Sequence, residues 1–259
     1  SFVREAEFKV GADLNVFFDS SSDETDSLLA IDGVEHASGL AQYYVTAAGE
    51  GQPLYGIDAK NAGFVRWHED SFNGMSPEEA LSKLSKPSST PGVFVGEDFA
   101  DINRISEGDR LELYFMGNNP DTLPPEAGAT GKDGEPGKDG LPDIPTIKGN
   151  VTVLGTFDHI PPGITFGILC DQSVFRAVEP LIMGHLATEV PAPTYFVELK
   201  DGANREQVKR DIGAITGAGT IMDLQEEGKV QDNFGISGLL TLMLVLSLVG
   251  LVVGSFTFS

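Results

Sequence analysis

The hydrophobic pattern of the chain changes sharply at its end, because residues 233–259 carry no charge and are dominated by Leu, Val, Ile and Phe. About 20 apolar residues are enough to cross the hydrocarbon core of a bilayer, whereas a helix on the surface of a soluble domain keeps one polar face. We therefore predict one transmembrane helix over residues 233–259. We predict that the membrane-spanning residues include Phe234, Gly238, Leu242, Leu246, Gly250, Gly254 and Phe258.

Two glycines of this span have the spacing of a helix contact. Gly250 and Gly254 form a G-x-x-x-G pattern, which lets a second membrane helix approach closely. The alternative is that these glycines have no special role, since glycine is common in membrane helices. No basic residues follow the apolar run, and we expect the sequence to be a piece of a longer membrane protein.

The residues before the span alternate between short β-type and helix-type patterns. Strands are predicted within 6–19, over Gln42–Val45, Val93–Val95, Leu111–Phe115, Asn150–Phe157, within 163–171 and over Thr194–Leu199. Helices are predicted near 27–33, from a Ser76 cap through Leu84, from Asp171 toward Val178, and after an Asn204 cap, with Val208, Ile212 and Ile215 on one face. Turns are expected at 49–51 and at Gly108–Asp109. Strands combined with a few helices predict an α+β fold.

The segment from Gly128 to Pro142 repeats glycine at every third position, in five consecutive triplets. Collagen has this pattern, because only glycine fits near the axis of its three chains. Five triplets are too few to hold a trimer, so we predict a flexible, solvated surface loop over 128–142.

The composition limits the partners of the protein. The formal net charge is −22, and the 17 basic residues are scattered singly. Nucleic acid and anionic lipid headgroups are therefore poor partners, while the acidity fits a salty habitat, solubility or a cationic ligand equally well. The single cysteine, Cys170, excludes an internal disulfide and is expected to be a small buried hydrophobic residue.

The sequence contains few groups with the spacing of a catalytic or metal site. Its four histidines lie in separate segments without a zinc-type spacing, and there is no nucleophile or phosphate-loop motif. Asp158 and His159 are adjacent on a predicted strand, where neighbours point to opposite faces, and Trp67 is expected in the core. We predict no catalytic, cofactor-binding or metal-binding residue, and no nucleotide hydrolysis by this chain.

Four stretches, taken in order, resemble the extracytoplasmic domain of FtsX/MacB-like permeases of ABC transporters. They are GVEHASGLAQYY at 33–44, PLYGIDAKNAGF at 53–64, VFVGEDFADINRISEGDRLEL at 93–113 and VTVLGTFDHIPPG at 151–163. A strand and helix ending in ELKDGANREQVKRDI follow, and the apolar span comes next. The collagen-like loop and the acidic residues at 97–98 depart from the family pattern.

The resemblance implies a fold of two lobes. A discontinuous porter-like α+β lobe would comprise residues 1–57 and 191–232, with a β-rich lobe of residues 58–190 inserted between them. The transmembrane helix of 233–259 would follow. The full-length protein would be a multi-pass protein of the cell membrane, with residues 1 to about 232 outside the cytoplasm and another span before this domain.

The resemblance also implies a function without catalysis by this chain. A partner ABC-type ATPase subunit would hydrolyse ATP, and a second permease copy, identical or different, would complete the transporter. The outer domain would convert ATP hydrolysis into movement outside the membrane, for export, lipoprotein release or mechanotransmission, and no cofactor is expected. Two alternatives are a membrane-anchored cell-surface binding or adhesion domain and a membrane-tethered hydrolase.

Overall fold

The computed structural model describes residues 7, 9–19, 23–116, 146–175 and 194–227 of the 259-residue chain. The predicted span at 233–259 and the collagen-like loop at 128–142 lie outside these residues. Within the described ranges, no helix is both long enough and apolar enough to cross a membrane.

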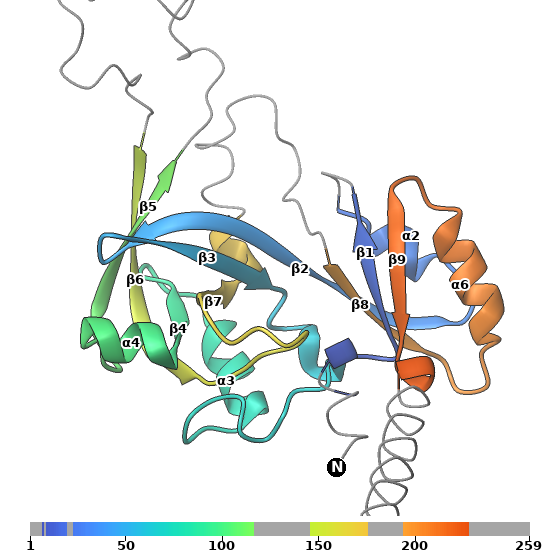
Figure 1. The fold of residues 1–259 in the computed structure, drawn as a ribbon, viewed down its shortest axis with the longest axis horizontal. Helices are drawn as coiled ribbons and strands as arrows, with labels where there is room; N and C mark the ends of the chain where they lie inside the picture. Colours follow the sequence, from blue (N-terminus) through green and yellow to red (C-terminus); the bar gives the residue numbers. More distant parts are fainter. Residues whose placement is uncertain (1–6, 8, 20–22, 117–145, 176–193, 228–259) are drawn as a thin grey trace, which may run out of the picture.

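Strands dominate the described residues, with a few short helices between them (Figure 1). The strands are β1 (Leu14–Phe18), β2 (Val34–Ala47), β3 (Glu50–Ile57), β4 (Gly92–Gly96), β5 (Arg110–Met116), β6 (Thr146–Phe157), β7 (Ile168–Asp171), β8 (Thr194–Leu199) and β9 (Ala218–Asp223). The helices are α2 (Thr25–Leu29), α3 (Pro77–Leu84), α4 (Glu97–Asn103) and α6 (Arg205–Gly213), with the 3-10 helix η1 (Ala62–Phe64). The predicted combination of strands with a few helices is confirmed.

The strand β2 pairs with different neighbouring strands along its length. The sheet order is β3-β7-β4-β6-β5-β2-β8-β1-β9, and β3 also pairs with β2. The first half of β2, from Val34 to Leu40, pairs with β8. Its second half pairs with β3 from Leu40 onward and with β5 at residues 45–47. One strand therefore belongs to two differently built regions.

The first region is a closed ring of six strands, because the β2–β3 pairing joins the two ends of the series β3-β7-β4-β6-β5-β2. Alternate residues of these strands point to one side and form one apolar cluster, including Val93, Val95, Leu111, Leu113, Phe115, Val151 and Val153. A second cluster joins the other side of the ring to α3 and includes Phe94, Phe157, Leu81 and Leu84. The ring thus has apolar residues on both of its sides.

The second region is an open sheet made by β8, β1 and β9 together with the first half of β2 (Figure 1). Its apolar cluster combines Leu14, Val16 and Phe18 with Tyr195, Val197 and Leu199, and with Leu28 of α2 and Val208 and Ile212 of α6. The members of this cluster come from residues 14–37 and 195–212. Segments near the two ends of the chain therefore share one core.

The helix starts predicted from capping residues are confirmed. Ser76 accepts a hydrogen bond from the Glu79 backbone amide at the start of α3, and Asn204 accepts one from Gln207 at the start of α6. Such side chains satisfy backbone amides that have no partner within the helix. Residues 172–175 are helical, as predicted for the beginning of the segment from Asp171.

Other local predictions were confirmed only in part. The extended segment predicted within 6–19 contains β1, but residues 7, 9 and 10 are helical. The strands predicted at Val93–Val95 and Leu111–Phe115 are confirmed as β4 and β5, but the pattern missed α4, which separates them, and each strand pairs with β6. The turn expected at 49–51 lies earlier, because β3 already begins at Glu50.

The end of the domain contains one more strand than the sequence pattern predicts. The helix α6 ends at Gly213, and β9 follows it and pairs with β1. A separate helical segment begins at Leu224. The sequence pattern missed β9 because only one of its six residues is buried, so it lacks a clear apolar alternation.

The positive-φ glycine Gly11 gives a stability prediction with a matched control. A Cβ atom at Gly11 would lie 2.6 Å from Cε1 of Phe196 and 2.9 Å from Cβ of Pro161, while one at Gly49 would meet no atom within 4 Å. We expect Gly11→Ala to lower the free energy of unfolding by about 3 kcal/mol, since backbone strain and crowding add. Gly49→Ala should cost about 1 kcal/mol, from the backbone alone.

Urea unfolding of the 259-residue chain in mild detergent measures both variants. Equal losses for Gly11→Ala and Gly49→Ala would show that the contact with Phe196 does not constrain the fold.

Candidate functional site

The two ends of the described fold leave it side by side. The strands β1 and β9 are antiparallel neighbours, and Leu14 of β1 lies opposite Asp223 of β9. The chain is helical at residues 9–10, just before β1, and at residues 224–227, just after β9. The Leu224 amide donates to the Asp13 carbonyl at 3.1 Å. Figure 1 shows both helical segments at the same edge of the molecule. We call this region the junction.

Asp13 is the acceptor that joins most parts of the junction. Its Oδ1 accepts from Nη2 of Arg66 at 2.7 Å, and its Oδ2 accepts from the Leu199 amide at 3.0 Å. Its backbone carbonyl also accepts from Nη1 of Arg205 at 3.1 Å. Charge-assisted bonds of this kind are stronger than neutral ones. Through its carboxylate and its carbonyl, Asp13 thereby ties the start of β1 to β8, α6 and the loop after η1.

A second group of charges fixes the other side of the junction. Arg205 Nη1 donates to Oδ1 of Asp223 at 2.8 Å, and Asp223 has a side chain that is only 2% exposed. The same Oδ1 accepts from the Gln225 amide at 2.9 Å. A buried carboxylate must have such partners, since its desolvation costs free energy. The start of the exit helix is thus hydrogen-bonded to the end of β9.

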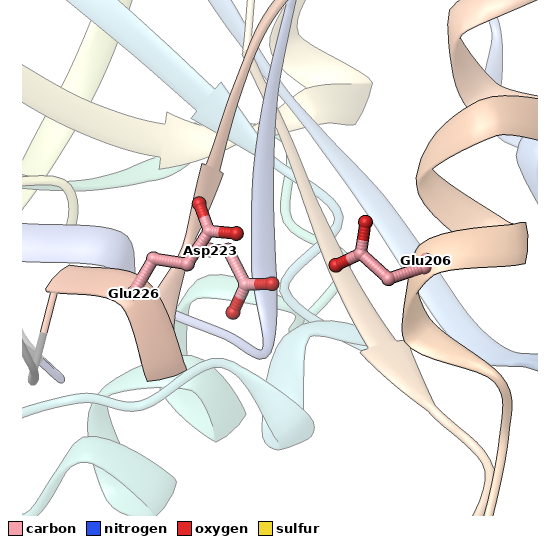
Figure 2. A group of neighbouring side chains, drawn as sticks. All are labelled: Glu206, Asp223 and Glu226. Atoms are coloured by element: carbon pink, nitrogen blue, oxygen red, sulfur yellow. The ribbon is translucent and has the colours of Figure 1, made fainter.

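The carboxylates of Glu206, Asp223 and Glu226 lie close together, and Figure 2 shows Glu206 extending from α6 toward the other two. Three carboxylate oxygens within 4.8 Å of one another have the composition of a divalent-cation site. However, the Lys209 ammonium lies 2.8 Å from Glu206, 3.3 Å from Asp223 and 2.7 Å from Glu226. The pKa of the Lys209 ammonium is raised, most of all by its hydrogen bond to Glu206 and next by its hydrogen bond to Glu226. The chain supplies its own cation here, so we interpret the group as structural.

A direct ion pair also links the two exit segments. Nζ of Lys9 lies 2.9 Å from Oε2 of Glu227, and the two side chains are 52% and 26% exposed. An ion pair this exposed contributes at most about 1 kcal/mol. The contacts of the partly buried Asp13 and of the buried Asp223 therefore hold the junction, and the Lys9–Glu227 pair orients its two helical segments.

The structure brings together two histidines that are far apart in the sequence. The rings of His68 and His159 have centroids 5.1 Å apart. The expectation that Asp158 and His159 point apart was wrong, because both follow the end of β6 and Nδ1 of His159 lies 2.6 Å from Oδ2 of Asp158. No sequence spacing signals this pair, since it depends on two loops meeting. His36 instead stacks on Phe64, and His185 lies outside the described residues.

Cys170 and Trp67 both serve packing in the structure. Cys170 is completely buried, which raises the pKa of its thiol well above its ordinary value, as the prediction of a small buried residue requires. Trp67 packs against the cluster beside α3, and its indole donates to the Ala62 carbonyl at 3.2 Å. The predicted span residues, from Phe234 to Phe258, all lie outside the described residues.

The chain matches no family model and no curated protein. It is similar to the periplasmic region of MacB from Actinobacillus actinomycetemcomitans, at 8% identity and a TM-score of 0.45, over 87% of this chain and 95% of that one. It is also similar to the extracellular domain of the ABC-type transporter YknZ from Gram-positive bacteria, at 11% identity and a TM-score of 0.41, over 80% of this chain and 90% of that one. A permease domain from Porphyromonas gingivalis is similar at 13% identity and a TM-score of 0.43, over 79% of this chain and 83% of that one.

The buried position of Asp223 gives a test of the junction. We expect Asp223→Asn to lower the free energy of unfolding by about 3 kcal/mol, because it leaves Arg205 and Lys209 without their most buried partner. Glu206→Gln removes a carboxylate whose side chain is 67% exposed, and it should cost less than about 1 kcal/mol. Urea titrations compare the two. A loss for Glu206→Gln that equals the loss for Asp223→Asn would contradict the interpretation of Asp223 as the buried partner that holds Arg205 and Lys209.

Proposed function

We propose that this chain is the extracytoplasmic domain of an ABC transporter permease, and that it moves when a partner ATPase hydrolyses ATP. The domain itself carries no catalytic role in this proposal. Its full-length form is a multi-pass protein of the cell membrane, and residues 1 to about 232 lie outside the cytoplasm.

The observation that carries the proposal is the position of the two exits of the fold. Residues 9–10 and 224–227 are helical, adjacent and tied by Asp13 and by the Lys9–Glu227 pair. A domain inserted between two successive membrane helices needs exits that lie this close, because the helices that support it pack together. The apolar sequence at 233–259 supplies a span directly after the second exit.

The junction also supports a mechanical role. Movement of a membrane helix is transmitted to a domain only if the connection between them is stiff, since a flexible linker absorbs the movement. Here residue 224 is hydrogen-bonded to Asp13 and residue 225 to Asp223. Movement of the exit helix would therefore act directly on β1 and β9, and through β8 on β2.

The two-lobe organisation is part of the proposal. The porter-like lobe comprises residues 1–57 and 191–232, and the inserted β-rich lobe comprises 58–190. Two features support it: the cluster on the open sheet draws its residues from 14–37 and 195–212, and four of the six ring strands fall between residues 92 and 171. The strands β2 and β3 would then belong in sequence to the first lobe while completing the ring of the second.

The proposal predicts a specific partner. When the full-length parent protein is purified in mild detergent from its native cell, a P-loop ATPase should accompany it in stoichiometric amount, because the outer domain has no source of energy of its own. Quantitative mass spectrometry of the purified complex measures the ratio. A matched purification of an unrelated multi-pass protein from the same membranes controls for nonspecific association. Recovery of the parent protein without an ATPase would contradict the proposal and favour an anchored surface domain.

A further inference from the structure

A groove of about 680 Å³ lies between η1, the residues that follow it and α3. We call it the η1–α3 groove. The apolar part of its described lining includes Phe64, Trp67 and, from α3, Leu81. Its volume falls within the range of pockets that bind small molecules. A ligand that fills this groove must be apolar at least in part.

The η1–α3 groove borders the junction. Glu7, which lines the groove, is helical and lies two residues before Lys9, whose Nζ is 2.9 Å from Oε2 of Glu227. Arg66 also lines the groove. Its Nη1 lies 3.7 Å from Oε1 of Glu7, and its Nη2 lies 2.7 Å from Oδ1 of Asp13. The groove therefore lies next to the place where the chain enters and leaves the fold.

The junction lies close to the bilayer if the apolar sequence at 233–259 spans it, so this inference rests on the proposed function. Five residues, 228–232, separate the last described residue from that sequence. Even fully extended, they keep Glu227 within about 20 Å of the hydrocarbon core, and the headgroup layer occupies about 5–8 Å of that distance. Figure 1 shows α3 at a height similar to that of the helical segment after β9. The groove therefore lies near the lipid headgroups.

Two charged side chains of the groove are available to a ligand. Lys60 and Glu78 both line it and are both exposed. Within the described residues neither belongs to an ion pair, unlike Arg66 and Glu79. An ammonium group only donates hydrogen bonds, and a carboxylate only accepts them. A ligand with one phosphate and one ammonium group satisfies both, whereas a purely anionic ligand would be repelled by Glu78.

The aromatic side chains of the groove suit the depth at which it lies. Phe64 and Trp67 are both partly exposed. The indole nitrogen of Trp67 donates to the Ala62 carbonyl at 3.2 Å, so a ligand meets the carbon atoms of the ring. Tryptophan is enriched where membrane meets water, because its large ring is mostly apolar and its one donor needs a polar partner. These rings match the glycerol and first methylene groups of a lipid.

We propose that the η1–α3 groove binds a zwitterionic phospholipid of the adjacent bilayer surface, with the chemistry of phosphatidylethanolamine. Lys60 donates to its phosphate, and Glu78 accepts from its ammonium group. Phe64 and Trp67 contact the glycerol and the upper part of the acyl chains. The bound lipid gives the domain a second contact with the membrane, beside the two exits of the chain.

The fluorescence of Trp67, the single tryptophan of the chain, tests the proposal. The 259-residue chain is placed in phosphatidylcholine vesicles with increasing fractions of phosphatidylethanolamine that carries a nitroxide quencher on its acyl chain, close to the glycerol. We expect quenching that saturates as this lipid fills the groove. Lys60→Gln should raise the fraction that gives half of the quenching about tenfold, the effect of losing one hydrogen bond to a charged group. Lys60→Arg, which retains a phosphate donor, should change it less than about twofold.

The exposed Lys200, which follows β8, provides the matched control. Lys200→Gln removes the same charge outside the groove and should change the half-quenching fraction less than about twofold. A shift equal to that of Lys60→Gln would show diffuse attraction to the lipid surface and overturn the proposal. Stronger quenching by labelled phosphatidylglycerol, which is anionic, would overturn it too. Emission from Trp67 that changes with the number of chains per vesicle, and not with the labelled lipid, would assign the groove to a second copy instead.

Flotation of the same vesicles on a density gradient separates this inference from the proposed function. A chain that floats with the vesicles, but whose Trp67 is not quenched, would overturn the lipid site and leave the transporter proposal standing. A chain that does not float would contradict the membrane span and overturn both.

Discussion

The structure depends on one strand that two regions share. The first half of β2 pairs with β8 in the open sheet, and its second half pairs with β3 and β5 in the ring. Its residues contribute to three apolar clusters: Val34 to that of the open sheet, Leu40 to that beside α3, and Val45 to that of the ring. Because the backbone of β2 continues from one core to the next, the two regions cannot separate unless the pairing of β2 is disrupted. A hinge at this place would require the loss of ladder hydrogen bonds.

The junction extends this stiffness to the two ends of the domain. Asp13 and Asp223 are carboxylates with several donors each, and their partners come from segments far apart in sequence. Removing a partner of Asp223 leaves a buried charge unsatisfied, so the network favours a single arrangement. The exposed Lys9–Glu227 pair contributes little to stability by comparison. What the charged residues provide is a fixed direction for the chain as it enters β1 and leaves β9.

Sequence patterns predicted the elements that carry their own signals. Ser76 and Asn204 cap helices, and alternation marks Leu111–Phe115 and Thr194–Leu199 as strands. Local patterns did not reveal β9, whose pairing with β1 supplies its order, or α4, whose acidic first turn resembles a loop. The junction and the His68–His159 contact also escaped prediction, since both depend on segments that meet only in the folded chain.

The central claim is that the exit after β9 transmits force, and its most direct measurement is energy transfer from a fluorophore on α4 to acceptors on lipid headgroups. Asp101→Cys provides the attachment site, since the native Cys170 is completely buried. The full-length protein, purified together with the ATPase that we propose as its partner, is compared with two variants. Both carry the same flexible Gly/Ser insertion, either at Lys229 or at Gly49 in the β2–β3 turn. Addition of ATP should change the transfer in the parent protein and in the Gly49 variant, and should leave it unchanged in the Lys229 variant although ATP is still hydrolysed. An undiminished change in the Lys229 variant would contradict the account.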